Sequence, residues 1–279
     1  MNALDHAILV RQLMPAVLAA GACLLRHRAA GVTPQRKADG SPVSVADREA
    51  EDILLAALAV AAPDVPVIAE EQVSAGRIPA FDARAFLVDA LDGTKEFLAG
   101  TPDFTVNVAM VSDRRPVFGM VLAPAAGRLF VTLGEKRAAQ AFVREDELAS
   151  GAMPALVDIT TVEPDRARLR LITSRSHRAA ATEEFLRDYR IIEDIRMGSS
   201  IKFGIIAAGE ADIYPRFGPT CEWDIAAGHA VLAAAGGTVT LEDGNPFLYL
   251  DKSRIGRTDP FLNPPFLALG RESLLPGAR

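Results

Sequence analysis

A buried strand that ends in two aspartates and a Gly-Thr turn is the feature that most constrains this chain. The segment Leu87–Phe97 reads LVDALDGTKEF. Its apolar run predicts a strand over 86–92 that fixes Asp89 and Asp92 at its end, and the turn aims backbone N–H groups at an anion. Mg²⁺ prefers carboxylate, water and phosphate oxygens. The segment therefore predicts a metal-assisted phosphate-ester hydrolase, although a plain strand end, turn and helix cap is the ordinary alternative.

Composition narrows the classes of partner. The chain has 279 residues, 49% of them hydrophobic, and a net charge of −6. It is long enough for a large core, and its lack of a long basic run excludes nucleic acid as the main partner. A small anionic substrate stays open, because a local metal site can override the global charge. Cys23 and Cys221 are the only cysteines, which is typical of a reduced cytoplasm.

The apolar run Leu13–Leu25 needs its own interpretation. Arg11 precedes the run and Arg26-His27-Arg28 follow it, so the positive charge is heavier behind it, the reverse of a secretion signal. The run itself is too short to span a bilayer. We expect no integral membrane span, and a core-facing first helix over 4–28 that Pro15 either kinks or splits.

The remaining pattern mixes strands and helices. After a loop over 29–43, Ser44 opens a helix that ends near Val60. We expect strands at 65–68, 104–112, 116–124, 128–134, 169–172, 191–196 and 211–217, and helices at 180–189, 200–208 and 224–235. This order indicates an α/β or α+β layered fold. We expect a single domain, 1–279, with two subdomains, 1–145 and 146–279, divided in the stretch 135–166 where the pattern weakens.

Acidic residues recur at the ends of these elements. Asp47 follows a helix start, Glu70 follows the strand at 65–68, and Asp224 opens a later helix, in addition to Asp89 and Asp92. Each one alone is explained as a helix cap or a solvated charge. The repeated placement at element ends favours a shared metal site.

Three motifs follow one another along the chain. They are Ile68-Ala69-Glu70-Glu71, Asp89-Ala90-Leu91-Asp92-Gly93-Thr94, and Trp223-Asp224 followed by an alanine-rich helix that closes at Gly236-Gly237. In this order they resemble the inositol monophosphatase superfamily of metal-dependent phosphatases. Ala90 stands where the family has proline. The segments 95–97, 104–107, 174–177, 198–203, 214–220 and 261–264 are similar to the bacterial 3′(2′),5′-bisphosphate nucleotidase branch. The resemblance implies a five-layered α-β-α-β-α sandwich with the metals between its halves, most ligands coming from the first half.

The resemblance assigns the acidic positions to magnesium. It implies two Mg²⁺ ions, and three in some members. Glu70, Asp89 and the carbonyl of Leu91 would hold the first ion, while Asp89, Asp92 and Asp224 would hold the second.

The resemblance also implies the catalytic groups. Thr94 with Asp47 would orient and deprotonate the attacking water. The N–H groups of Gly93 and Thr94 would bind the scissile phosphate. At the positions that the nucleotidase branch uses for a second phosphate, this chain has His177, Ser199, Lys202 and Arg216.

The implied reaction is hydrolysis of the 3′-phosphate of 3′-phosphoadenosine 5′-phosphate to AMP and phosphate, with the sulfated analogue as a second substrate, in sulfate assimilation. An inositol or fructose-1,6-bisphosphate phosphatase on the same scaffold is the alternative. We expect a cytoplasmic monomer or homodimer, and peripheral association with the inner membrane stays open.

Overall fold

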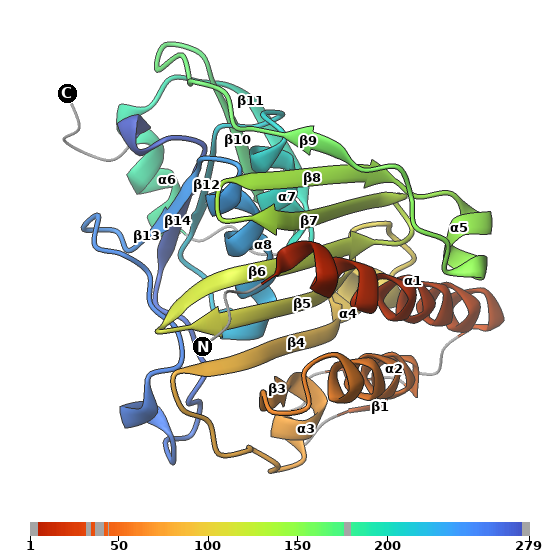
Figure 1. Ribbon diagram of the computed structural model, residues 1–279. Coiled ribbons are helices and arrows are strands. Elements are labelled where there is room, and N and C mark those ends of the chain that lie inside the picture. The colour runs from red at the N-terminus through yellow and green to blue at the C-terminus, as the bar shows by residue number, and fades with distance from the viewer. Residues whose placement is uncertain (1–4, 32–34, 37–41, 44, 176–179, 275–279) are drawn as a thin grey trace.

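Two mixed β-sheets with helices before, between and behind them make up the molecule (Figure 1). The computed structural model describes residues 5–31, 35–36, 42–43, 45–175 and 180–274. Three hydrophobic clusters fill the spaces between successive layers. The expected five-layered α-β-α-β-α sandwich is therefore confirmed.

The larger sheet has seven strands in chain order. They are β3 (Val67–Ala69), β4 (Arg84–Asp92), β5 (Thr105–Ser112), β6 (Arg115–Ala123), β7 (Arg128–Gly134), β8 (Arg137–Phe142) and β9 (Val157–Ile159). β3 pairs parallel to β4, and every later neighbour is antiparallel. Because short turns join antiparallel neighbours, this sheet follows the chain directly.

The smaller sheet has five strands in the order β11-β10-β12-β14-β13. They are β10 (Leu169–Ser174), β11 (Ile191–Met197), β12 (Ile213–Arg216), β13 (Thr238–Thr240) and β14 (Phe266–Leu269). β10 lies parallel to both β11 and β12, and β14 is antiparallel to its neighbours. The parallel pairs are joined through helices, as parallel connections require.

Helices cover the sheets in three layers. α1 (His6–Ala30) and α2 (Val45–Ala61) pack on the outer face of the larger sheet. α7 (Ile201–Ala207) and α8 (Glu222–Ala234) lie between the sheets, and α6 (Ala180–Phe185) packs on the outer face of the smaller sheet. Three short helices, α3 (Glu70–Ser74), α4 (Thr94–Leu98) and α5 (Glu145–Ser150), follow strands of the larger sheet, and 3₁₀ turns occur at 186–188, 252–254 and 272–274.

α8 is apolar on almost every side because it is buried between two sheets. It approaches β6 so closely that a Cβ at Gly119 would lie 2.2 Å from the carbonyl oxygen of Ala227. Glycine is therefore required there. This close contact fixes the start of α8, and with it Asp224, relative to the larger sheet.

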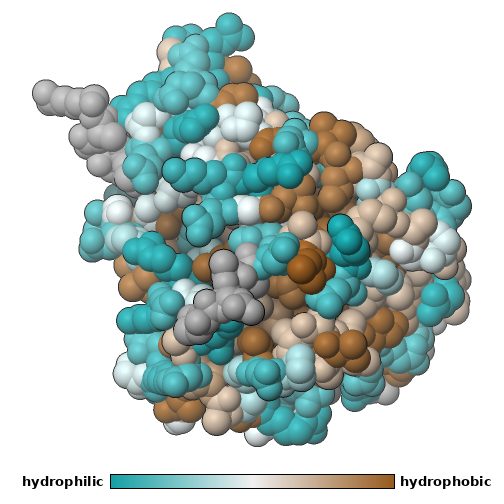
Figure 2. Space-filling model, in the orientation of Figure 1, coloured by the Kyte–Doolittle hydropathy of each residue, from teal (hydrophilic) through white to brown (hydrophobic). Residues whose placement is uncertain are grey.

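α1 is a buried core helix. By length and composition it could cross a membrane, but its apolar face, including Leu13, Val17 and Leu24, is buried against the larger sheet. The helix is continuous through Pro15, so of the two expected alternatives, a kink or a split, the split does not occur. On the same face of the molecule, Phe142 and Val157 are exposed on β8 and β9, where Figure 2 shows apolar surface.

Several elements differ from the sequence expectations. β8 and β9 extend the larger sheet into the stretch 135–166, so the chain passes to the smaller sheet only after Ile159. Within the expected loop 29–43, the pairs at 35–36 and 42–43 form a small two-stranded sheet, β1 and β2. Glu70 directly follows the strand, as expected, but it begins a short helix, α3, that the sequence did not predict. The expected helix start at Ser44 lies outside the described residues.

Candidate active site

Three aspartates from distant parts of the chain form one cluster. Asp89 and Asp92 lie at the end of β4, and Asp224 lies in the first turn of α8. One oxygen of each carboxylate lies within 4.8 Å of one oxygen of the others. The sequence placed these residues at element ends, and the structure brings all three together.

Each aspartate is oriented by a backbone amide. Leu91 N donates to Asp89 Oδ1 at 2.9 Å, and Ser200 N donates to Asp92 Oδ2 at 2.6 Å. Cys221 N donates to Asp224 Oδ2 at 2.7 Å. These bonds hold one oxygen of every carboxylate, so the rotamers are fixed before any ligand arrives.

The cluster is electrostatically unfavourable without a cation. Burial, and then the charges of Glu70, Asp92 and Asp224, raise the pKa of Asp89 well above its ordinary value. The pKa of Asp224 is raised by burial, then by Asp92 and Glu70. Burial raises the pKa of Asp92 too, although Lys202 opposes that rise. Charged oxygen donors crowded in this way are typical of a site for a hard divalent cation.

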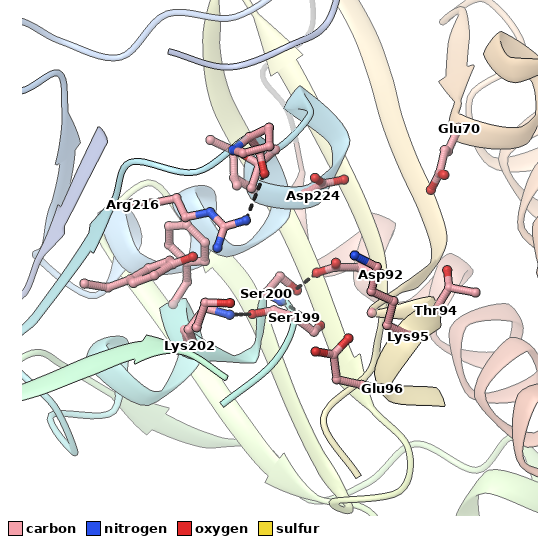
Figure 3. Close-up of a pocket in the computed structure, with 17 residues that line it drawn as sticks. Glu70, Asp92, Thr94, Lys95, Glu96, Ser199, Ser200, Lys202, Arg216 and Asp224 are labelled. Carbon is pink, nitrogen blue, oxygen red and sulfur yellow. Dashed lines mark hydrogen bonds between the residues drawn. The ribbon is translucent and has the colours of Figure 1, made fainter. Parts of the chain in front are cut away.

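Glu70 faces the aspartates from the start of α3 (Figure 3). The turn that carries it is held by Glu51 of α2, whose Oε2 accepts the N–H of Glu71 at 2.9 Å. Glu51 is 1% exposed, and burial raises its pKa to about 7. Glu51 thus connects α2 to the turn that carries Glu70.

The turn after β4 depends on a glycine. Gly93 has φ of 90°, and a Cβ there would lie 2.9 Å from the carbonyl oxygen of Asp103. Thr94 follows as the first residue of α4, and its Oγ1 donates to the carbonyl of Leu91 at 3.3 Å. The Leu91 carbonyl is therefore held at the strand end beside the carboxylates.

A cavity of about 250 Å³ joins this acidic end to a cationic end. Glu70, Asp92, Gly93, Thr94 and Asp224 line one part of it, and Ser199, Lys202 and Arg216 line another. In Figure 3, Lys202 and Arg216 lie on the opposite side of the cavity from Glu70 and Thr94. The site has two poles of opposite charge.

The cationic end is buried. Lys202 of α7 is 3% exposed, donates to the carbonyls of Ser199 and Met197, and lies 5.0 Å from the centre of the Tyr214 ring. Burial lowers its pKa to about 8. Arg216 of β12 is 8% exposed and donates to Pro219 O at 2.8 Å, while its Nε has no partner among the described residues. An unpartnered buried cation donor indicates an anionic ligand.

Among the predicted site residues that the structure describes, Asp47, Asp89 and Leu91 do not line this cavity. Asp47 is buried in the first turn of α2 and is not among the residues that line the cavity. His177 lies outside the described residues.

Comparisons with known proteins identify the group of enzymes to which this site belongs. Residues 8–272 match the Inositol monophosphatase family. The 3′(2′),5′-bisphosphate nucleotidase CysQ of Escherichia coli K12 is 38% identical over 231 residues, 82% of this chain and 86% of its own length. The chain belongs to the inositol monophosphatase family.

Solved structures of family members agree with the fold. A CysQ crystal structure from Bacteroides thetaiotaomicron covers 97% of this chain and 100% of its own, with a TM-score of 0.70 and 30% identity. An inositol monophosphatase from Zymomonas mobilis covers 98% and 96%, with a TM-score of 0.72 and 22% identity. The second comparison supports the fold alone.

The structure adds residues that the sequence analysis missed. Ser200 donates to Asn107 Oδ1 at 2.6 Å and lies 2.8 Å from Thr105 Oγ1, so β5 supports the amide that orients Asp92. Glu51 supports Glu70 from α2. The four-residue spacing of Asp47 and Glu51 on one helix face could have revealed Glu51, and Ser200 lies within a motif already noted.

Proposed function

We propose that this protein is a Mg²⁺-dependent phosphatase that hydrolyses the 3′-phosphate of 3′-phosphoadenosine 5′-phosphate to AMP and phosphate. The observation that carries the proposal is the pairing of an acidic end with the buried cations Lys202 and Arg216 in one cavity. A substrate with one phosphate would bind through the acidic end alone. A substrate with two phosphates would place one at each end of the cavity.

Magnesium fits the donor set of the acidic end, because every candidate ligand is a hard oxygen donor. Glu70, Asp89 and the Leu91 carbonyl would hold one ion. Asp89, Asp92 and Asp224 would hold a second ion. We also propose that a third ion binds near Glu70. Bound Mg²⁺ would supply charge to the phosphoryl oxygens and acidify the attacking water.

The chain's own residues would position the reactants. Thr94 and Asp47 would take the proton of the water that attacks phosphorus as the bond to the 3′-oxygen breaks. The Gly93 and Thr94 N–H groups would donate to the scissile phosphate. The left-handed backbone of Gly93 supports this role, because it turns the chain sharply at the strand end.

The second phosphate would occupy the cationic end. With a pKa of about 8, Lys202 is protonated at neutral pH, and Arg216 lines the same cavity. Ser199, which lines the same cavity, would add a hydroxyl donor. Charge-assisted bonds of this kind are the strong ones. His177 keeps its predicted role in binding this phosphate.

One chain supplies every site residue named here, so a monomer or a homodimer would be active. We propose a cytoplasmic role in recycling the nucleotide by-product of sulfate assimilation, with the sulfated analogue as a second substrate.

Phosphate release from 3′-phosphoadenosine 5′-phosphate, inositol 1-phosphate and fructose 1,6-bisphosphate, measured with and without Mg²⁺, tests the proposal. We expect Mg²⁺-dependent release with a preference for the nucleotide. Preference for inositol 1-phosphate would overturn the role of the cationic end, and preference for the sugar bisphosphate would overturn the nucleotide specificity. Equal rates without Mg²⁺ would overturn the metal mechanism.

A further inference from the structure

A second group of metal-ligating side chains lies between α1 and α2, away from the cavity described above. Cys23 and His27 are four residues apart on α1, so they share one face of that helix. Glu49 reaches them from α2. One ligand atom of each lies within 4.8 Å of those of the other two.

The contacts within this group converge on one carboxylate oxygen. Glu49 Oε2 lies 2.7 Å from His27 Nε2 and accepts from the Cys23 thiol at 3.6 Å. A tetrahedral Zn²⁺ with ordinary bond lengths separates a sulfur from an oxygen ligand by about 3.6 Å, and a nitrogen from an oxygen by about 3.3 Å. The Cys23–Glu49 distance already matches that separation, and the His27–Glu49 pair would need to open by about half an ångström.

The donor types select a different metal from the acidic cluster. Thiolate and imidazole favour Zn²⁺ and related transition ions over Mg²⁺, which prefers oxygen ligands. The site is also accessible from one side, since the side chain of His27 is 29% exposed and that of Glu49 is 53% exposed, whereas Cys23 is buried. Three protein ligands with an open fourth position is a known zinc arrangement.

We propose that Cys23, His27 and Glu49 form a second metal site that binds Zn²⁺, with water as the fourth ligand. The ion would join α1 to α2, the helix whose first turn carries Asp47. Binding would convert the Cys23 thiol to a thiolate and release its proton. Burial and the charge of Glu49 raise the pKa of this thiol, so a proton is available for release at neutral pH.

Binding of Zn²⁺ and Co²⁺ to the full chain tests the proposal, with excess Mg²⁺ present to occupy the acidic cluster. We expect about one Zn²⁺ per chain, a raised melting temperature, and a sulfur-to-cobalt charge-transfer absorption with Co²⁺. Cys23→Ser should abolish that absorption, and Cys23→Ser and His27→Gln should each weaken Zn²⁺ binding by about tenfold or more. Glu49→Gln should weaken it less, because an amide oxygen remains.

Matched controls separate this site from the other places where Zn²⁺ could bind. Cys221→Ser removes the only other thiol, Asp52→Asn removes a neighbouring exposed carboxylate of α2, and Asp89→Asn disables the acidic cluster. All three should keep the Co²⁺ absorption and the Zn²⁺ affinity. The proposal is overturned if the wild-type chain binds no Zn²⁺ in excess Mg²⁺, or if Asp89→Asn rather than Cys23→Ser removes the binding.

Discussion

The two ends of the cavity are built in different ways. At the acidic end, Asp89 and Asp92 come from one strand end of the larger sheet, and backbone amides orient them. At the cationic end, Lys202 comes from α7 and Arg216 from β12 of the smaller sheet. The acidic end is therefore built around one contiguous segment, which Glu70 of α3 and Asp224 of α8 complete, whereas the cationic end comes from two separate elements. We infer that the acidic end determines the chemistry and the cationic end the choice of substrate.

Both ends of the cavity bury charged side chains, which is energetically unfavourable. Burial raises the pKa of Asp89 and Asp224 and lowers that of Lys202, so each buried charge is disfavoured without a partner. A cation at one end and an anion at the other would relieve both. Substitutions at one end, with catalysis and substrate binding both measured, therefore show whether the two ends act separately.

The largest effect is expected at the acidic end. Asp89→Asn should lower kcat by about a hundredfold or more, because it removes a charged ligand that both proposed ions share. The metal-free variant should be at least as stable as wild type, since a buried charge repulsion is removed, and Mg²⁺ should no longer raise its melting temperature. Initial rates and thermal unfolding check this. Asp64→Asn, an exposed change, is the control, and near-normal turnover in Asp89→Asn would contradict the metal mechanism.

The next largest effect is expected at the cationic end, where substitutions should change substrate binding more than catalysis. Lys202→Met and Arg216→Ala should each raise the KM for the bisphosphate nucleotide by about ten- to a hundredfold, since a charge-assisted hydrogen bond contributes about 1.5–3 kcal/mol. Their kcat should change much less. Steady-state kinetics at saturating Mg²⁺ measure both constants, with the exposed Lys136→Ala as a control. An unchanged KM in both variants would show that the second phosphate binds elsewhere.

The pH dependence of KM tests the role of Lys202. Because its pKa is lowered to about 8, the side chain is charged below that pH and loses its charge above it. The KM for the bisphosphate should therefore stay flat from pH 6 to 7 and rise by about tenfold by pH 9. Lys202→Arg should abolish the rise, because arginine stays charged. The same rise in that variant would assign the titration to another group.

The smallest effect concerns the support of the acidic end. Glu51→Ala leaves the Glu71 N–H without its acceptor and should weaken Mg²⁺ activation by about fivefold, the worth of one ordinary hydrogen bond. Glu51→Gln keeps an acceptor oxygen and should stay near wild type. The Mg²⁺ concentration that gives half-maximal rate is the measurement, and equal behaviour of the two variants would remove this positioning role.

The sequence alone predicted the β4 part of the acidic end better than it predicted the rest of the cavity. The end of β4 is a local pattern of an apolar strand followed by Asp, Gly and Thr, so it can be interpreted without the fold. That Asp224 would join it depended on a resemblance, because only the packing of α8 between two sheets brings it there. The convergence of Lys202 and Arg216 is likewise a property of tertiary structure.

Other features of the structure were not predicted because the sequence pattern for them is weak or absent. β8 carries alanines and polar residues and β9 has only three residues, so neither shows a clear alternation of apolar side chains. The Cys23, His27 and Glu49 group joins two different helices, and no spacing rule links its glutamate to the other two residues. Contacts between helices follow from packing, which a single sequence does not display.

We infer that the two ends of the cavity bind the two phosphates of one substrate. Comparing kcat/KM for adenosine 3′,5′-bisphosphate and adenosine 3′-monophosphate, in wild type and in Arg216→Ala, tests it most directly. We expect wild type to favour the bisphosphate by about ten- to a hundredfold and the variant to lose most of that preference. Equal kcat/KM values in wild type, or a preference that Arg216→Ala leaves intact, would show that the cationic end does not bind the second phosphate.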